Sequence, residues 1–154
     1  MLRVLTLALM AVICSYGQVN AFKPLSRAEP VVRMVLQEAA NEPLAGMVAV
    51  AGVALDRVAD SRWPDTPVGV VYQGNRSRRT AQFTGMSITL RDYTPDQITR
   101  ARIAVATAEV GERPCGRILY YHTTAVSPPW DYTKIEVACQ IGDHIFYRDK
   151  ENRG

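Results

Sequence analysis

The amino-acid sequence predicts a single α+β domain, with helices in its first half and short strands in its second. Apolar residues recur at helical spacing between about residues 30 and 110, and β-rich runs follow from residue 118. The length of 154 residues is that of one domain. No internal repeat interrupts this order.

The composition excludes several classes of protein. Hydrophobic residues make up 47% of the chain and charged residues 21%, which is ordinary globular usage and unlike a disordered, collagen-like or coiled-coil chain. Lys and Arg number 18 against 15 Asp and Glu, and the basic residues are scattered apart from one cluster. We therefore expect no nucleic-acid partner.

The first 21 residues have the pattern of a secretory signal peptide. Arg3 provides a positive start, Val4 to Ile13 carries no charge, and Val19-Asn20-Ala21 offers small residues for cleavage after Ala21. The apolar run is shorter than the ~20 residues of a membrane-spanning helix. The expected division is thus a signal peptide at 1–21 and one mature domain at 22–154.

Two other interpretations of this segment stay open. Ala11-Val12-Ile13-Cys14 is a weak lipoprotein site, because Ile13 is bulky where a small residue is expected, and the segment could remain as an uncleaved tether. With cleavage, the protein is exported to the periplasm or cell envelope, touches the membrane only through this segment, and is expected to be a monomer.

Two helices are predicted at the start of the mature chain. The first, Pro30 to Glu42, follows a proline suited to a first turn and places Val31, Val35 and Ala39 on one face. The second, Leu44 to Ala59, is nearly apolar on all sides until Asp56, which is typical of a central buried helix.

The middle of the chain is predicted to hold loops and a third helix. Asp60 to Pro67 contains two prolines and reads as a loop, Val68 to Tyr72 is a short apolar run, and Gly74 to Thr80 is an arginine-rich loop. That loop is either a solvated turn or a contact for an anionic polymer. The third helix opens with a capping box at Thr94 and stops at Gly111.

Three strands are predicted near the carboxyl terminus, at Ile118 to His122, Lys134 to Ala138 and His144 to Tyr147. Without Cys14, the mature chain keeps Cys115 and Cys139. An even pair in an exported chain predicts one disulfide, and two buried free thiols are the alternative.

Glu38 is the strongest candidate for acid–base chemistry. It lies between Leu36 and Ala39 on the first predicted helix, where apolar neighbours would desolvate it and raise its pKa; the other interpretation is an ordinary exposed glutamate. The two histidines, His122 and His144, are more simply explained by hydrogen-bond networks than by metal ligation, since no His-Glu-x-x-His motif is present.

Several segments, taken in order, resemble the SleB-type cell-wall hydrolases, the spore-cortex-lytic enzyme family. The resemblance covers roughly residues 31–148. Its blocks are Val35 to Pro43, Gly46 to Val58, Gly69 to Tyr72, Gln82 to Thr84, Tyr121-His122 leading to Pro129-Trp130, and Ile141 to Tyr147.

This resemblance implies a compact lysozyme-like, lytic-transglycosylase-like fold and a glycosidase that cuts peptidoglycan glycan strands. It places the catalytic glutamate at Glu38, which would protonate the bond between N-acetylmuramic acid and N-acetylglucosamine without a metal or cofactor. It also implies substrate contacts by Gln82, Tyr121, His122 and Trp130.

The chain departs from the family pattern at three positions. Asn41 replaces the usual Gly, Asp56 the usual Asn, and Thr84 the usual Ser. The added carboxylate of Asp56 is either a structural partner near Arg57 or an influence on the pKa of Glu38.

Two alternative functions are carried alongside the glycosidase. One is a metal-dependent amidase that would use His122, His144 and a carboxylate to cut the stem peptide. The other is a peptidoglycan-binding protein without catalysis. Both bacterial envelope remodelling and a phage endolysin fit the sequence, which does not distinguish hydrolysis from transglycosylation.

Overall fold

The structure is a computed structural model that describes residues 28–73 and 89–150. The predicted signal peptide at 1–21, the arginine-rich segment at 74–80, and Gln82, Phe83 and Thr84 lie outside these residues.

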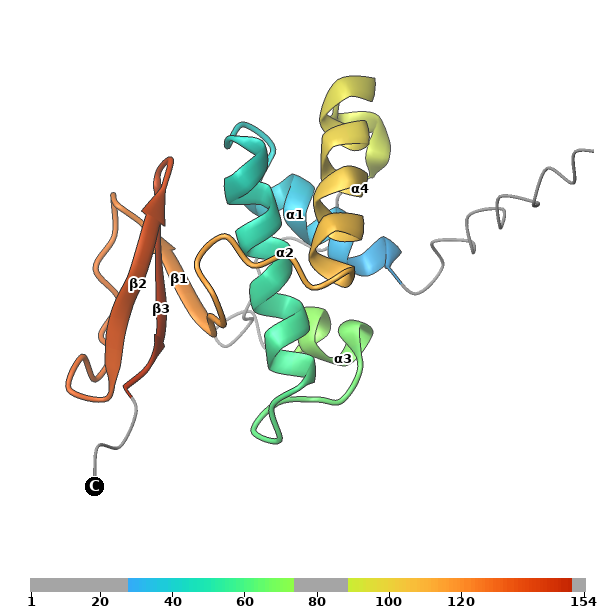
Figure 1. Cartoon of the computed structure of the whole chain (residues 1–154). Coiled ribbons are helices and arrows are strands. Elements are labelled where there is room, and N and C mark those ends of the chain that lie inside the picture. The colour runs from blue at the N-terminus through green and yellow to red at the C-terminus, as the bar shows by residue number, and fades with distance from the viewer. Residues whose placement is uncertain (1–27, 74–88, 151–154) are drawn as a thin grey trace, which may run out of the picture.

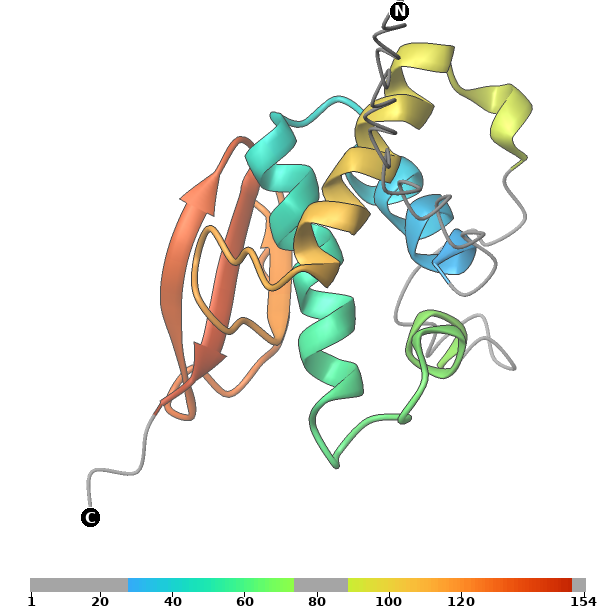
Figure 2. The same ribbon diagram turned by 45° about the vertical axis from the view of Figure 1, so that its right-hand side comes forward.

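Within the described residues, four α-helices precede three strands, so the predicted order is confirmed. The helices are α1 (Glu29–Ala39), α2 (Leu44–Val58), α3 (Pro67–Tyr72) and α4 (Pro95–Glu109), with a short 3₁₀ helix at Leu90–Asp92. The strands are β1 (Tyr120–Thr123), β2 (Ile135–Ile141) and β3 (His144–Asp149). Figures 1 and 2 show the sheet on one side of α2 and the other helices on its opposite side.

Helix α2 forms the centre of the core, as its apolar sequence predicted. Its residues from Met47 to Ala51 are all buried, and it packs against α1, α3, α4 and β1. Small residues allow these close contacts, because short side chains let neighbouring backbones approach. The cavities described below lie at the two ends of this helix.

Local sequence signals explain the other helices, with one correction. Thr94 caps α4 through the predicted capping box with Gln97, and the chain leaves α4 at Gly111 with a positive φ of 97°. The predicted loop ends before Pro67, which instead starts α3. Thr66 accepts a hydrogen bond from the Gly69 amide at 3.1 Å, so Pro67 occupies a first turn, where a missing N–H costs nothing.

The sheet is antiparallel, with strand order β1-β3-β2. Strand β1 starts at Tyr120 rather than Ile118, and β2 extends to Ile141 with an irregularity between Val137 and Cys139. In the β1–β3 register, Tyr121 lies opposite Phe146 and His122 opposite Ile145. Since neighbouring residues of a strand point to opposite faces, Tyr121 and His122 belong to different sides of the sheet.

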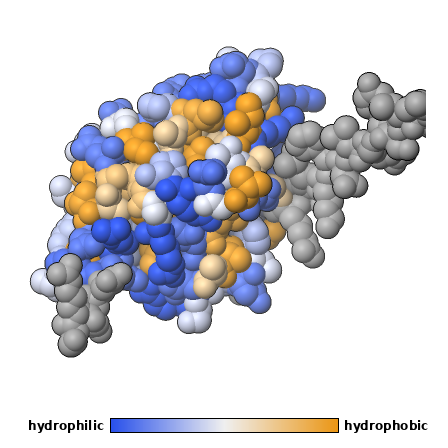
Figure 3. Space-filling view, in the orientation of Figure 1, coloured by the Kyte–Doolittle hydropathy of each residue, from blue (hydrophilic) through white to orange (hydrophobic). Residues whose placement is uncertain are grey.

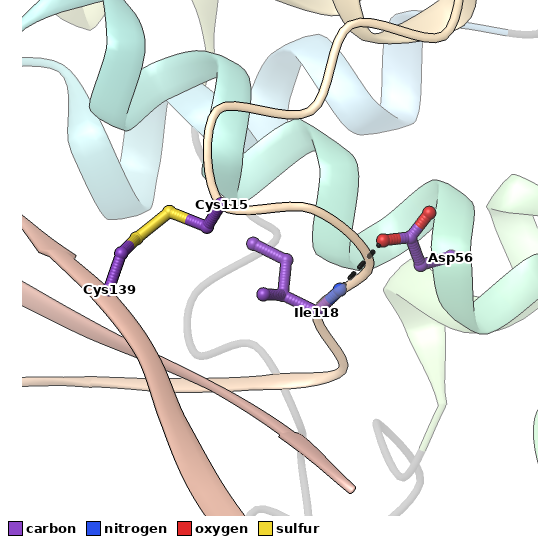
Figure 4. Close-up of a disulfide and its surroundings, with 4 residues drawn as sticks. All are labelled: Asp56, Cys115, Ile118 and Cys139. Carbon is purple, nitrogen blue, oxygen red and sulfur yellow. Dashed lines mark hydrogen bonds between the residues drawn. A yellow bond between two sulfur atoms is a disulfide. The ribbon is translucent and has the colours of Figure 1, made fainter. Parts of the chain in front are cut away.

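The segment between α4 and β1 is fastened to both layers (Figure 4). The predicted disulfide between Cys115 and Cys139 is present and links this segment to β2, with a Cα–Cα distance of 5.7 Å. The Asp56 carboxylate of α2 accepts hydrogen bonds from Arg113 Nε at 2.9 Å and from the Ile118 amide at 3.0 Å. Asp56 is therefore a structural partner of Arg113 and Ile118.

Within residues 28–73 and 89–150, no helix is both long and apolar enough to cross a membrane. On the face shown in Figure 3, hydrophobic residues lie in several groups among hydrophilic ones.

Candidate active site

Glu38 lies in the last turn of α1 and lines a cavity of about 610 Å³. The cavity is bounded by the end of α1, the start of α4, the end of β1 and the β2–β3 turn. Its lining includes Glu38, Asn41, Glu42, Tyr93, Gln97, Thr123, Asp143 and His144. Two of these walls come from segments about a hundred residues after Glu38, so only the folded chain assembles them.

The Glu38 carboxyl group has the pKa expected of a general acid. Burial among apolar neighbours raises its pKa from 4.5 to about 6, and the Tyr121 hydroxyl partly opposes this shift. Desolvation dominates because a carboxylate loses more hydration energy than a neutral carboxyl group when it is buried. About one tenth of the Glu38 carboxyl groups is therefore protonated at pH 7, compared with about three in a thousand for a carboxyl group of pKa 4.5.

Tyr121 reaches Glu38 from the helix-facing side of β1. Its ring packs against His144 and Phe146, with centroids 5.2 Å and 5.8 Å away. Burial raises the pKa of Tyr121 well above 10, so its hydroxyl keeps its proton. This hydroxyl oxygen is buried without a completed hydrogen bond in the described part of the chain. Tyr121 therefore supplies a donor to the Glu38 carboxylate as that group ionises.

Glu42 joins the end of α1 to the β2–β3 turn. Its carboxylate accepts the Asp143 amide at 3.2 Å through Oε2 and lies 3.4 Å from His144 Nδ1 through Oε1. A Cβ atom on Gly142, whose φ is +55°, would collide with this carboxylate. Burial lowers the pKa of His144, and the Glu42 charge opposes the shift. Glu42 thus positions the turn that forms one wall of the cavity.

Helix α4 holds the α1–α2 connection from the other side. Arg100 Nη2 donates to the Glu42 carbonyl at 2.6 Å, and Gln97 Nε2 donates to the Asn41 side-chain oxygen at 3.1 Å. Asn41, which differs from the family's usual Gly, therefore has a structural partner. These contacts fix the backbone just after Glu38, which limits the movement of its side chain.

His122 lies on the other face of the sheet from Glu38. Its Nδ1 lies 2.8 Å from the Thr123 carbonyl and its Nε2 lies 2.8 Å from the Tyr147 hydroxyl. A carbonyl only accepts, so in the neutral ring Nδ1 carries the proton and Nε2 accepts from Tyr147. Both nitrogens are engaged within the protein, and the ring stacks on Tyr147 with centroids 5.3 Å apart.

Trp130 also lies away from Glu38. It contacts His122 and Tyr147, with ring centroids 5.5 Å and 5.8 Å away, and lines a second cavity. The structure thus brings Tyr121 to Glu38 but not His122 or Trp130, and Gln82 lies outside the described residues. Sequence reasoning missed Tyr93 and Asp143 as cavity residues, because no local pattern indicates which turn faces the end of α1.

No group of three His, Cys, Asp or Glu side chains suited to a metal occurs in the described residues. The amidase hypothesis needs His122 and His144 at one site. His144 pairs with Thr123, the neighbour of His122, so the two imidazoles belong to opposite faces of the sheet.

The family model described as Cell Wall Hydrolase matches residues 41–147. The chain belongs to the cell wall hydrolase family. The match starts just after Glu38, and the resemblance expected from the sequence is confirmed.

Similar proteins of this family include two spore cortex-lytic enzymes. The one from Oceanobacillus iheyensis is 38% identical over 114 residues, which is 73% of this chain and 38% of that protein. The one from Bacillus cereus is 36% identical over 114 residues, which is 73% of this chain and 40% of that protein. The chain therefore spans about two fifths of the length of these curated relatives.

Two solved structures of the family share the fold. The catalytic domain of the germination-specific lytic transglycosylase SleB from Bacillus anthracis has a TM-score of 0.64 and 29% identity, and the match covers 84% of this chain and 98% of that domain. The Bacillus cereus SleB catalytic domain has a TM-score of 0.61 and 27% identity, with 86% and 99% covered. The predicted lysozyme-like α+β fold is therefore confirmed.

Proposed function

We propose that this protein is a glycosidase that cleaves peptidoglycan glycan strands, with Glu38 as its general acid. The observation that carries the proposal is the buried Glu38 carboxyl, with a pKa raised to about 6, at the edge of a 610 Å³ cavity. A cavity of this size is within the range of small-ligand sites. Membership of the cell wall hydrolase family supports the choice of peptidoglycan as substrate.

In the proposed reaction, Glu38 first donates its proton to the glycosidic oxygen between N-acetylmuramic acid and N-acetylglucosamine. The bond from C1 of the muramic residue to that oxygen breaks, and the electron pair leaves with the oxygen. The ionised Glu38 then takes the proton from the C6 hydroxyl of the same muramic residue while the C6 oxygen bonds to C1. The products are a free 4-hydroxyl and an anhydromuramic end.

This route needs one carboxyl group, which suits the arrangement around Glu38. Glu42 is engaged with the Asp143 amide and lies beside His144, so it is a positioning residue for the β2–β3 turn. Tyr121 would donate to Glu38 after the first proton transfer and hold the carboxylate in place for the second. Attack by water in place of the C6 hydroxyl would make the enzyme a muramidase.

The experiment is mass spectrometry of the fragments that the full chain releases from purified peptidoglycan. Glu38→Gln should lower release by about 10²- to 10⁴-fold, because it removes the proton donor. Glu109→Gln, an exposed glutamate on α4, is the matched control and should release fragments at the normal rate. A chelator should have no effect.

The fragment ends decide among the alternatives. Anhydromuramic ends indicate a lytic transglycosylase, and reducing muramic ends indicate a muramidase; both support the proposal. Intact glycan with freed stem peptides, lost on chelation, would establish the amidase instead. Binding to peptidoglycan without any soluble product would identify a non-catalytic binding protein and overturn the proposal.

The predicted substrate contacts of Gln82, Tyr121, His122 and Trp130 stand as part of this proposal. So do export through residues 1–21 to the periplasm or envelope, a monomeric state, and either bacterial or phage-endolysin use. The mass of the chain recovered from the envelope fraction tests export, since cleavage after Ala21 predicts a product that begins at Phe22.

A further inference from the structure

A second cavity, of about 410 Å³, lies at the other end of α2 from Glu38. Its lining includes Arg57 from the last turn of α2, Trp63 from the loop that follows, Tyr120 from β1, and Trp130. The lining residues thus come from α2 and the loop after it, from β1, and from the segment between β1 and β2. The sequence contains two tryptophans, and both line this cavity.

The three aromatic rings form an arc with Tyr120 in the middle. The Trp63 and Tyr120 centroids are 6.0 Å apart with planes at 64°, and those of Tyr120 and Trp130 are 5.9 Å apart at 53°. The rings are tilted or edge-on to one another rather than stacked flat. They therefore make a bent aromatic wall instead of a closed stack.

Neighbouring groups hold this wall in place. The Arg62 guanidinium lies over the Trp63 ring, 4.6 Å from its centroid, and is paired with the Asp60 and Asp149 carboxylates. The Tyr120 hydroxyl donates to Asp149 at 3.0 Å. A rigid wall loses little side-chain freedom when a ligand binds, which favours a recognition surface.

The polar part of the cavity has more cationic than acidic side chains in its lining. Arg57 Nε donates to the Leu119 carbonyl at 2.8 Å, and Lys134 lies 3.3 Å from Asp131 at the exposed rim. Two cationic side chains, Arg57 and Lys134, and one carboxylate, Asp131, thus line the cavity beside the aromatic wall. A ligand that fits has a flat apolar C–H face together with a carboxylate, which is the chemistry of a muramic acid residue in a glycan strand.

The two cavities are far enough apart to act separately. Helix α2 has 15 residues, so at a rise of 1.5 Å per residue it is about 22 Å long. Glu42 precedes its first residue, and Arg57 lies in its last turn. A ligand at the aromatic wall therefore does not occupy the space beside Glu38.

We propose that Trp63, Tyr120 and Trp130 form a second glycan-binding site that holds peptidoglycan away from the Glu38 cavity. The identity of the ligand rests on the proposed function, whereas the existence of the site does not. A strand or neighbouring strand held here raises the local concentration of cleavable bonds at Glu38. The site acts as an anchor and takes no part in proton transfer.

The test uses the intrinsic fluorescence of the two tryptophans, which reports on this cavity directly. The full chain carrying Glu38→Gln is titrated with soluble disaccharide-peptide fragments of peptidoglycan and, separately, with neutral N-acetylglucosamine tetramers. Both should give a saturable change in emission, with tighter binding of the anionic fragments. The Glu38→Gln background keeps the ligands intact during the titration.

Substitutions at the aromatic wall test whether the emission change arises from binding at this cavity. Tyr120→Ala should weaken binding of both ligands at least tenfold. Lys134→Gln, at a rim position whose side chain is 80% exposed, should weaken binding of the anionic fragments severalfold and leave binding of the neutral tetramers unchanged. Tyr72→Ala, an exposed aromatic outside both cavities, is the matched control and should bind normally.

The outcomes separate this site from the proposed function. Fragment release by the unsubstituted chain with no emission change in the titration would overturn the second site and leave the glycosidase standing. A saturable emission change without fragment release would do the reverse. An equal response to the stem peptide alone, or titrations unaffected by both Tyr120→Ala and Lys134→Gln, would overturn glycan recognition at this wall.

Discussion

The two cavities, one at each end of α2, differ in how the side chains that line them affect the stability of the fold. At the first end, Glu38 is a buried carboxyl whose pKa is raised, so its charged form is disfavoured by the fold. At the other end, Trp130 packs against Tyr120, His122 and Tyr147, so the same rings that line the cavity also support the sheet. The comparison indicates that an acid site costs stability, whereas an aromatic wall contributes to it.

The largest effect expected for the unsubstituted protein is the pH dependence of cleavage. Since the proposed acid must be protonated and its pKa is about 6, the protonated fraction falls from about one half at pH 6 to about one hundredth at pH 8. Fragment release should fall about fiftyfold over this interval, measured as initial rates with the fold checked at each pH. A rate that rises between pH 6 and pH 8 would contradict the role given to Glu38.

The aromatic end should be the more sensitive to truncation. Trp130→Ala removes contacts with four rings and should lower the free energy of unfolding by about 2–4 kcal/mol, below the upper range for a fully buried tryptophan. Denaturant titration measures this. Val126→Ala, an exposed position in the same loop, should change stability by less than about 0.5 kcal/mol. Equal losses of stability for the two variants would contradict the conclusion that the aromatic wall supports the sheet.

Substitution of Glu38 should raise the stability of the folded protein, whereas truncation of Trp130 lowers it. A native pKa of about 6 against 4.5 in the unfolded chain means that the folded protein loses stability as pH rises from about 4.5 through 6. The loss is at most about 2 kcal/mol, since one pKa unit corresponds to 1.36 kcal/mol. Glu38→Gln should therefore stabilise the protein by up to that amount at pH 8 and by almost nothing at pH 4.

Thermal unfolding at the two pH values checks this difference. Glu109→Gln serves as the control and should show no pH-dependent gain, because this glutamate is exposed. A Glu38→Gln variant less stable than the parent at pH 8 would mean that the carboxylate is better solvated in the fold than its burial indicates.

The smallest expected effect is that of Tyr121→Phe. The hydroxyl lowers the pKa of Glu38, so its removal should move the alkaline limb of the rate profile to higher pH, by less than about one unit. Stability should change little, because this hydroxyl completes no hydrogen bond in the described residues. Tyr132→Phe, whose hydroxyl donates to the Pro128 carbonyl, should leave the limb in place.

Much of the fold follows from local sequence patterns. The apolar run of α2 predicts a buried helix, the capping box at Thr94 predicts the start of α4, and the cysteine pair predicts the disulfide. The start of α3 was missed, since a proline reads equally as a loop residue and as a first helical turn. Only the Thr66 hydrogen bond to the Gly69 amide distinguishes the two.

The apolar helix neighbours of Glu38 and the resemblance to the cell-wall hydrolases both pointed to this residue, although the neighbours alone left an exposed glutamate as the alternative. The structure buries its carboxyl group. The sequence could not decide which aromatic residues meet that carboxyl. Tyr121 and His122 are adjacent in the sequence, but successive side chains of a strand point to opposite faces. Tyr121 therefore lies on the side of Glu38, and His122 contacts Trp130. Grouping Trp63 with Trp130 required the packing of distant segments, since contacts between side chains far apart in the chain exist only once the core has formed.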